Sequence, residues 1–206
     1  TRSALILGVD RATAESAEFI DVVPTAAGNS RRLPGEGFSY SSAHWLPDGR
    51  VIILKASAQG RPMRLYRVEL PDGQHEPLTP EGIGGWVVSP DGSKIAVNGP
   101  QDAIQLYPSQ GGAARTVPQT TGWEWLLGWI DAGLLIMRFD DPAAPRGEVY
   151  LLDPVTGRQR SWSNILPRDG AGIMQLVSFA TTADGRTHVF SWHRALSNLY
   201  IADGLA

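Results

Sequence analysis

Short apolar runs rich in β-branched residues recur along the chain, and each one follows a tight turn. The runs cover residues 51–54, 94–97, 134–139 and 187–192. The turns before them are Pro47-Asp48-Gly49, Pro90-Asp91-Gly92, Asp131-Ala132-Gly133 and Ala183-Asp184-Gly185, with glycines spaced by 43, 41 and 52 residues. Tight hairpins need positive φ, which Gly adopts freely and which Asp tolerates while it bonds its own backbone. The pattern predicts repeated hairpins, with these structural turn residues: Asp48, Gly49, Asp91, Gly92, Gly133, Asp184 and Gly185.

A second marker follows each turn at a nearly constant distance. It is an aliphatic residue followed by Tyr, at Leu65-Tyr66, Leu106-Tyr107, Val149-Tyr150 and Leu199-Tyr200, and each Tyr lies 15 or 17 residues after the turn glycine. Another turn then closes the strand, at Asp72-Gly73, Gly111-Gly112, Thr156-Gly157 and Asp203-Gly204. The repeating unit is strand, turn, strand, loop, strand, turn, strand. Four antiparallel strands in about 40–45 residues are typical of a β-propeller blade.

The pattern predicts an all-β fold, a single β-propeller domain of about five four-stranded antiparallel blades. The expected blades span residues 1–35, 36–80, 81–119, 120–165 and 166–206. The first unit lacks its first strand and the last lacks its fourth, which leaves about 18 strands in all. Open sheet edges at both ends invite pairing with missing blades of the same chain, with a second copy, or with each other. The pattern is equally compatible with a closed ring of five blades and with an arc that absent blades or a second copy would complete.

The third unit has the most specific sequence, in which residues 88–97 read Val-Ser-Pro-Asp-Gly-Ser-Lys-Ile-Ala-Val. Together with Leu106-Tyr107 downstream, this segment resembles the WD40-like repeat of the Tol-type β-propellers. The segment from Trp45 to Gly49 is similar to that family's Trp-x-Pro-Asp-Gly opening, whereas the fourth unit keeps Trp129 but loses the Pro, and the fifth has Thr181 instead of the Trp. The resemblance covers nearly the whole chain and implies a repeat scaffold used for binding.

Residues 194–205 resemble the closing segment of large acidobacterial-type proteins, in which such propellers follow a serine/threonine kinase domain or a winged-helix DNA-binding domain. That resemblance implies the C-terminal part of a regulatory protein whose effector domain lies outside the sequence. The chain begins at Thr1 with no signal-peptide pattern, so we expect it to be cut from a longer protein. The family resemblance favours a periplasmic location, and the absence of Cys is compatible with both periplasm and cytoplasm.

Charge and composition narrow the classes of partner. The net charge of −3 and the pI of about 5.8 provide no basic surface for a nucleic acid. The longest apolar run, residues 125–130, is far shorter than the ~18 residues of a membrane span. The four histidines, His44, His75, His188 and His193, show no metal-ligand spacing, and no metal or other cofactor is predicted.

The sequence favours a non-enzymatic role. A peptidase domain would need a Gly-x-Ser-x-Gly elbow, which is absent, so a prolyl-oligopeptidase parent would leave this chain as its substrate-gating propeller. A glycosidase needs a pair of carboxylates on the innermost strands. The predicted innermost strands lie at residues 38–45, 83–88, 122–129 and 172–181. They contain a single acidic residue, Glu124, which cannot act as both acid and base.

The sequence contains seven tryptophans. Trp45 and Trp129 occupy equivalent positions four residues before a turn glycine and are expected in the core between blades. The repeat constrains Trp123, Trp125 and Trp162 less, and exposed aromatic side chains are typical anchors of binding surfaces. One of these three is therefore a candidate for an interaction surface. The preferred hypothesis is a binding or sensor propeller that uses its loops and its axial channel to hold a protein, a peptide or a small ligand. A peptidase-gating propeller and a glycosidase are the alternatives.

Overall fold

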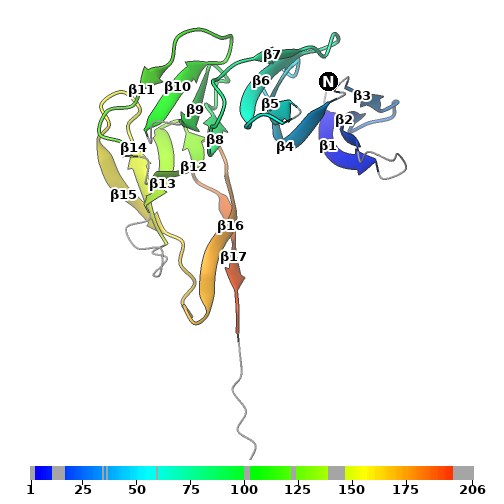
Figure 1. Ribbon diagram of the computed structural model, residues 1–206. Helices are drawn as coiled ribbons and strands as arrows, with labels where there is room; N and C mark the ends of the chain where they lie inside the picture. The colour runs from blue at the N-terminus through cyan, green and yellow to red at the C-terminus, as the bar shows by residue number, and fades with distance from the viewer. Residues whose placement is uncertain are drawn as a thin grey trace, which may run out of the picture.

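The computed structural model describes residues 3–10, 17–33, 35, 37–58, 60–99, 103–121, 124–138 and 147–196. These residues form 17 strands and no helix, which confirms the predicted all-β class. The strands build five consecutive antiparallel sheets, which are named the first to fifth blade in chain order. Figure 1 shows them following one another along a curve, as the blades of a propeller do.

The first blade contains β1 (Ser3–Asp10), β2 (Ala17–Pro24) and β3 (Arg31–Arg32). The second contains β4 (Phe38–Trp45), β5 (Val51–Ala58), β6 (Arg64–Glu69) and β7 (His75–Pro77). The third contains β8 (Trp86–Val88), β9 (Lys94–Asn98), β10 (Ile104–Pro108) and β11 (Arg115–Thr116). The fourth contains β12 (Glu124–Ile130), β13 (Gly133–Arg138), β14 (Glu148–Leu152) and β15 (Gln159–Asn164), and the fifth contains β16 (Ile173–Thr181) and β17 (His188–Arg194).

Within each blade every strand pairs with the next one along the chain. The first strand of each of the last four blades therefore lies at one edge of its sheet, which is the inner edge. The predicted third strand of the last unit, around Leu199-Tyr200, lies outside the described residues. So does Asp203-Gly204, the last of the predicted second turns.

Four apolar cores lie between consecutive blades and hold the arc together. Strand β5 shows how one strand serves two of them: Ile52 and Leu54 pack toward the first blade, whereas Val51 and Ile53 pack toward the third. Strands β9 and β13 divide their side chains between neighbouring cores in the same way. Each fully buried aliphatic side chain contributes about 1.5–3 kcal/mol, so most of the stability depends on stacking between blades. Burial on both faces also explains why these strands have unbroken apolar sequences.

The hairpin between the first two strands shares two hydrogen bonds in three blades: the Asp carboxylate accepts from the amide two residues further on, and the turn glycine amide donates to the carbonyl oxygen three residues before it. In the third blade Asp91 accepts from Ser89 Oγ at 2.6 Å and from the Ser93 amide at 3.0 Å. The pKa of Asp91 falls to about 2 because these hydrogen bonds, the one from Ser89 first, stabilise the carboxylate. The amide of Gly92 donates to the Ser89 carbonyl oxygen at 2.8 Å, and Gly92 has φ of +71°.

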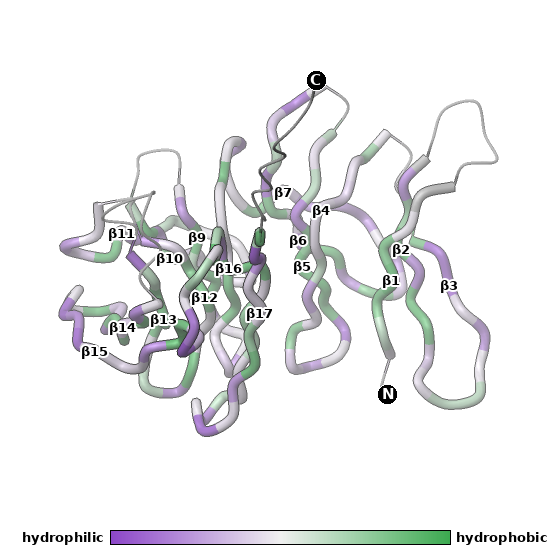
Figure 2. Tube along the Cα trace, turned by 90° about the horizontal axis from the view of Figure 1, so that it is seen from below, coloured by the Kyte–Doolittle hydropathy of each residue, from purple (hydrophilic) through white to green (hydrophobic). Residues whose placement is uncertain are grey.

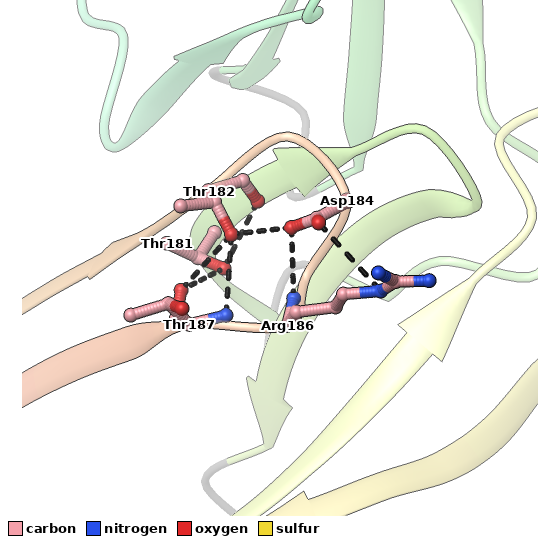
Figure 3. A network of polar contacts seen from close by, with 5 residues as sticks. All are labelled: Thr181, Thr182, Asp184, Arg186 and Thr187. Carbon is pink, nitrogen blue, oxygen red and sulfur yellow. Dashed lines mark hydrogen bonds and ion pairs between the residues drawn. The ribbon is translucent and has the colours of Figure 1, made fainter.

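The fifth blade repeats this arrangement with different side chains (Figure 3). Asp184 accepts from Thr182 Oγ1 at 2.5 Å and from the Arg186 amide at 3.0 Å. The Gly185 amide donates to the Thr182 carbonyl oxygen at 2.9 Å. In the second blade Asp48 accepts from the Arg50 amide at 2.9 Å. The Asp-Gly repeat of the sequence thus corresponds to one turn geometry, used again at each of these three positions.

The fourth blade has a different turn. Gly133 has φ of +143°, and a side chain there would overlap the carbonyl oxygen of Leu152 on the neighbouring strand β14. The Asp131 amide donates to the Ala183 carbonyl oxygen at 2.8 Å and so joins the turns of the fourth and fifth blades. This turn lacks the Pro-Asp-Gly sequence, and its Asp131 amide is bonded to the neighbouring blade.

Candidate functional site

The inner edges of four blades converge on one cavity. Strands β4, β8, β12 and β16, each the first strand of its blade, line a cavity of about 850 Å³ together with one residue of β5. Figure 2, seen from below, shows β12 and β16 side by side near the middle of the molecule. A β-propeller has its axial channel at this position, where the innermost strands face the common axis.

The cavity wall combines aromatic, hydroxyl and glycine positions. Its aromatic residues are Trp86, Trp125, Trp129 and Phe179. Its hydroxyl residues are Ser41, Ser42, Ser178 and Thr181, and its glycines are Gly84, Gly85 and Gly128. Neither Asp nor Glu is among the described lining residues. Polar groups on a partly apolar wall are typical of a ligand-binding cavity.

Lys55 is the cationic side chain of this wall. It interrupts an otherwise apolar stretch of β5 and donates from Nζ to the Gly84 carbonyl oxygen at 2.7 Å. Burial lowers the pKa of Lys55, because an ammonium group loses hydration beside the apolar wall. Among the described residues, none of the ion pairs within 4.0 Å involves Lys55. The cavity therefore contains a partly dehydrated positive charge.

Trp86 joins the second and third blades at the cavity wall. Its Nε1 donates to Ser42 Oγ at 3.0 Å, and its ring meets the edge of His44 with centroids 6.3 Å apart. Burial lowers the pKa of His44, which favours the neutral imidazole near pH 7. Trp86 is therefore fixed by a hydrogen bond while part of its ring borders the cavity.

The three tryptophans predicted as binding anchors lie in different surroundings. Trp123 is outside the described residues. Trp125 lines the cavity and is partly buried against the core between the fourth and fifth blades. Trp162 lies on the outermost strand of the fourth blade, packed against the same core, with its ring 5.1 Å from that of His188. Of the two described tryptophans in this set, the structure brings Trp125 to the axial cavity and leaves Trp162 away from it.

The two tryptophans expected in the core are half-buried at its margins. Trp45 packs against the core between the first and second blades, and Trp129 against that between the third and fourth. Trp129 also lines the cavity, which the sequence did not indicate. Trp86, Lys55 and the glycines Gly84 and Gly85 were likewise missed. A lysine inside an apolar run was the one local signal that marked this wall.

Glu124 does not line the cavity. Its side chain is 3% exposed, and its carboxylate accepts from the Thr121 amide at 2.9 Å and from Thr121 Oγ1 at 3.2 Å. Asn98 Nδ2 donates to its carbonyl oxygen at 2.9 Å, so the residue joins the third and fourth blades. Glu124 thus has a structural position, and the described cavity wall contains no carboxylate.

The described residues also bear on metal binding and on membrane crossing. No group of three or more His, Cys, Asp and Glu side chains lies close enough there to hold a metal ion. In the same part of the chain, no helix has the length and apolar character needed to cross a membrane.

The stacked blades and the axial cavity define this chain as a β-propeller segment. Its fold is similar to that of TolB from Acinetobacter baumannii, with a TM-score of 0.70 and 16% sequence identity over 95% of this chain and 48% of TolB. An uncharacterized protein from Listeria monocytogenes EGD-e has a TM-score of 0.55 and 15% identity, over 84% of this chain and 52% of that protein. The chain therefore has a TolB-like propeller fold and spans about half the length of these two structures.

Sequence comparison adds no closer relative. The chain matches no family model and no curated protein.

Proposed function

We propose that this chain is a binding propeller segment that holds a small ligand, or a short segment of a partner protein, in its axial cavity. The observation that carries this proposal is the convergence of four inner strands on one cavity of about 850 Å³. Ligand cavities in proteins typically measure about 300–1,000 Å³ and combine apolar walls with a few polar groups. The cavity meets both conditions.

The surrounding structure suits binding. The strands behind the cavity wall are among the most deeply buried of the chain, with Ile52, Ile53 and Leu54 of β5 each 0% exposed. A wall supported by packed strands stays in place, and a preformed site loses little conformational entropy when a ligand binds. The cavity wall offers tryptophan faces, hydroxyl groups and one ammonium group, and these groups recognise ligands without any chemical reaction.

We further propose that the chain serves as the sensor or scaffold part of a larger regulatory protein. A repeat scaffold presents its inner strands and loops to a partner, while catalysis belongs to another domain. The position of Glu124 supports a non-catalytic role, because acid–base hydrolysis of a glycoside needs two carboxylates that flank the substrate.

The experiment is ¹⁹F NMR of protein labelled with 5-fluorotryptophan. The seven tryptophan signals are assigned by single Trp→Phe variants, and the protein is titrated with indole-3-acetate, indole-3-acetamide and tryptamine as probes. We expect the signals of the cavity residues Trp86, Trp125 and Trp129 to shift with at least one probe, while those of Trp45 and Trp162 stay in place. The proposal fails if no probe shifts a cavity signal, or if all seven signals shift alike.

A further inference from the structure

We propose that the axial cavity recognises an organic carboxylate attached to a flat aromatic group, with Lys55 as the anion-binding residue. This inference rests on the proposed binding function and names the chemistry of the ligand. It follows from the placement of one positive charge, two adjacent glycines and three indole rings on a single wall.

Lys55 brings a positive charge and hydrogen-bond donors to the cavity wall. An ammonium group has three N–H donors, and the Gly84 carbonyl oxygen at 2.7 Å takes one of them. Each described ion pair of the protein uses an arginine, so no described carboxylate neutralises Lys55. A partly buried cation without a counter-ion is destabilising until an anion arrives. An anionic ligand in the cavity would supply the missing charge and accept the remaining hydrogen bonds.

The backbone at Gly85 lies close to the side chains of this wall. A Cβ atom on Gly85 would lie 3.0 Å from Asn98 Oδ1 and 3.8 Å from Trp125 Cδ1. Gly85 therefore lies against the edge of Trp125, directly after the residue that binds Lys55 Nζ. The ammonium group and an indole ring are thus positioned by one dipeptide, Gly84-Gly85.

The rest of the wall combines aromatic rings with hydroxyl groups. Trp86 and Trp129 add two more indole rings, and Ser42 and Ser178 add hydroxyl groups. Aromatic faces favour flat apolar groups, which they contact by stacking or at the edge. One ammonium group balances one negative charge, which favours a monocarboxylate over a phosphate dianion. The carboxylate can belong to a free aromatic acid or to the C-terminal aromatic residue of a peptide.

The test measures dissociation constants by isothermal titration calorimetry. The probes are indole-3-acetate and its neutral analogue indole-3-acetamide, and the peptide N-acetyl-Gly-Trp with a free or an amidated C-terminus. The proteins are the natural sequence, Lys55→Met, Lys55→Arg and Lys94→Met. Lys94 is the other lysine of the chain and is exposed at the start of β9, so it is a matched control for the loss of a positive charge.

We expect one carboxylate probe to bind the natural protein about tenfold or more tightly than its amide, because a charge-assisted hydrogen bond is lost with the amide. Lys55→Met should weaken binding of the carboxylate probe by a similar factor and leave the affinity for the amide probe unchanged. Lys55→Arg keeps the charge and should retain most of the affinity, and Lys94→Met should bind as the natural protein does. Preference for the free indole acid or for the peptide acid identifies which source the cavity accepts.

Two results would overturn the inference, and they differ. If acid and amide bind equally and Lys55→Met changes neither, the carboxylate assignment is wrong although cavity binding stands. If no probe binds the natural protein, the carboxylate assignment and the proposed function fail together. Thermal unfolding of each variant shows whether a lost affinity reflects the cavity or a loss of folding.

Discussion

Gly92, the turn glycine of the third blade, lies directly against Pro47 in the turn of the second blade, so closely that a side chain at Gly92 would overlap the proline ring. The contact has a counterpart two interfaces further on, where a Cβ on Gly185 would lie 2.9 Å from Ile130 Cδ1 of the preceding blade. The turn glycines therefore do more than adopt positive φ. They allow successive blades to approach each other beside the hairpins.

This double role predicts different costs for two otherwise similar substitutions. Gly82 has φ of +80°, and a Cβ there would meet nothing within 4 Å, whereas Gly92 has φ of +71° and a close neighbour. We expect Gly82→Ala to lower the free energy of unfolding by about 1–2 kcal/mol, the cost of positive φ alone. Gly92→Ala should lower it by about 2–5 kcal/mol, because overpacking against Pro47 adds about 1–3 kcal/mol. Urea unfolding measures both, and equal losses would show that the two blades are not in contact at this turn.

A second prediction concerns pH and the aromatic cluster of the second blade. Tyr40 Oη and His75 Nε2 are 3.0 Å apart, and His75 stacks on Phe38 with ring centroids 4.5 Å apart. Burial, followed by the nearby Glu18 carboxylate, raises the pKa of Tyr40 to about 12. Its hydroxyl therefore stays protonated near pH 7 and shares a hydrogen bond with the neutral imidazole. Burial also lowers the pKa of His75, so the folded state disfavours the imidazolium.

The direction of the pH effect follows from this lowered pKa. The unfolded chain takes up a proton at the ordinary histidine pKa of 6.5, before the folded protein does, so stability falls as the pH drops through 6.5 toward the folded value. We expect His75→Phe to lose about 1 kcal/mol at pH 7.5, through the missing hydrogen bond, yet to decline less between pH 7.5 and 5.5. His44, with its lowered pKa, retains part of the slope in both proteins. Urea unfolding at a series of pH values gives the comparison, and an unchanged slope in the variant would contradict it.

A third prediction concerns the two ends of the arc. On the fifth blade Val189 is 67% exposed and lies on the face opposite Phe190, which packs on the fourth blade. On the first blade Ile6 is 50% exposed and points away from the second. In the interior blades the corresponding faces are covered by a neighbour, so we expect the end faces of two copies to associate as successive blades do.

Light scattering over a range of concentrations tests this association. We expect the natural chain to form dimers or longer assemblies, and Val189→Lys to reduce the associated fraction severalfold. Val155→Lys is the matched control, because Val155 is 64% exposed but lies in the outer hairpin of the fourth blade. A natural chain that stays monomeric throughout, or equal effects of both lysines, would argue against pairing of the end faces.

The sequence predicted the propeller because its signals are local and repeated. The first strand of the second blade was expected at residues 38–45 and is β4, Phe38–Trp45. The apolar run at residues 51–54 belongs to the longer β5, Val51–Ala58, in which both faces are buried and the polar alternation is lost. The outermost strand β11, Arg115–Thr116, has two residues and pairs with β10 alone.

The cavity was only partly predictable. Its location follows from the repeat, because the first strand of every unit must face the axis. The juxtaposition of Lys55 with Gly84 joins two blades, and no local pattern shows which residues meet across that interface. Trp162 belongs to the fourth strand of its blade, so it lies far along the sheet from the inner edge, and its role as a binding anchor stays a prediction.

Consecutive sheets stack with their inner strands side by side. A cross-link between the inner strands β12 and β16 tests this arrangement most directly. A Cβ on Gly128 would lie 3.4 Å from Thr181 Cγ2, and the chain has no natural Cys. A Cβ on Gly128 therefore lies within reach of the Thr181 side chain, and we expect a cysteine pair at these positions to form a disulfide. Gly128→Cys with Val189→Cys is the control, because Val189 lies on the far face of the fifth blade.

The measurement is the number of free thiols per chain, counted by mass spectrometry after mild oxidation, alkylation and unfolding. Stacked blades predict that the Gly128→Cys, Thr181→Cys protein forms an intramolecular disulfide and retains no free thiol, while the control pair keeps both thiols. Equal oxidation of the two pairs, or free thiols in both, would contradict the stacking of the fourth and fifth blades around a common axis.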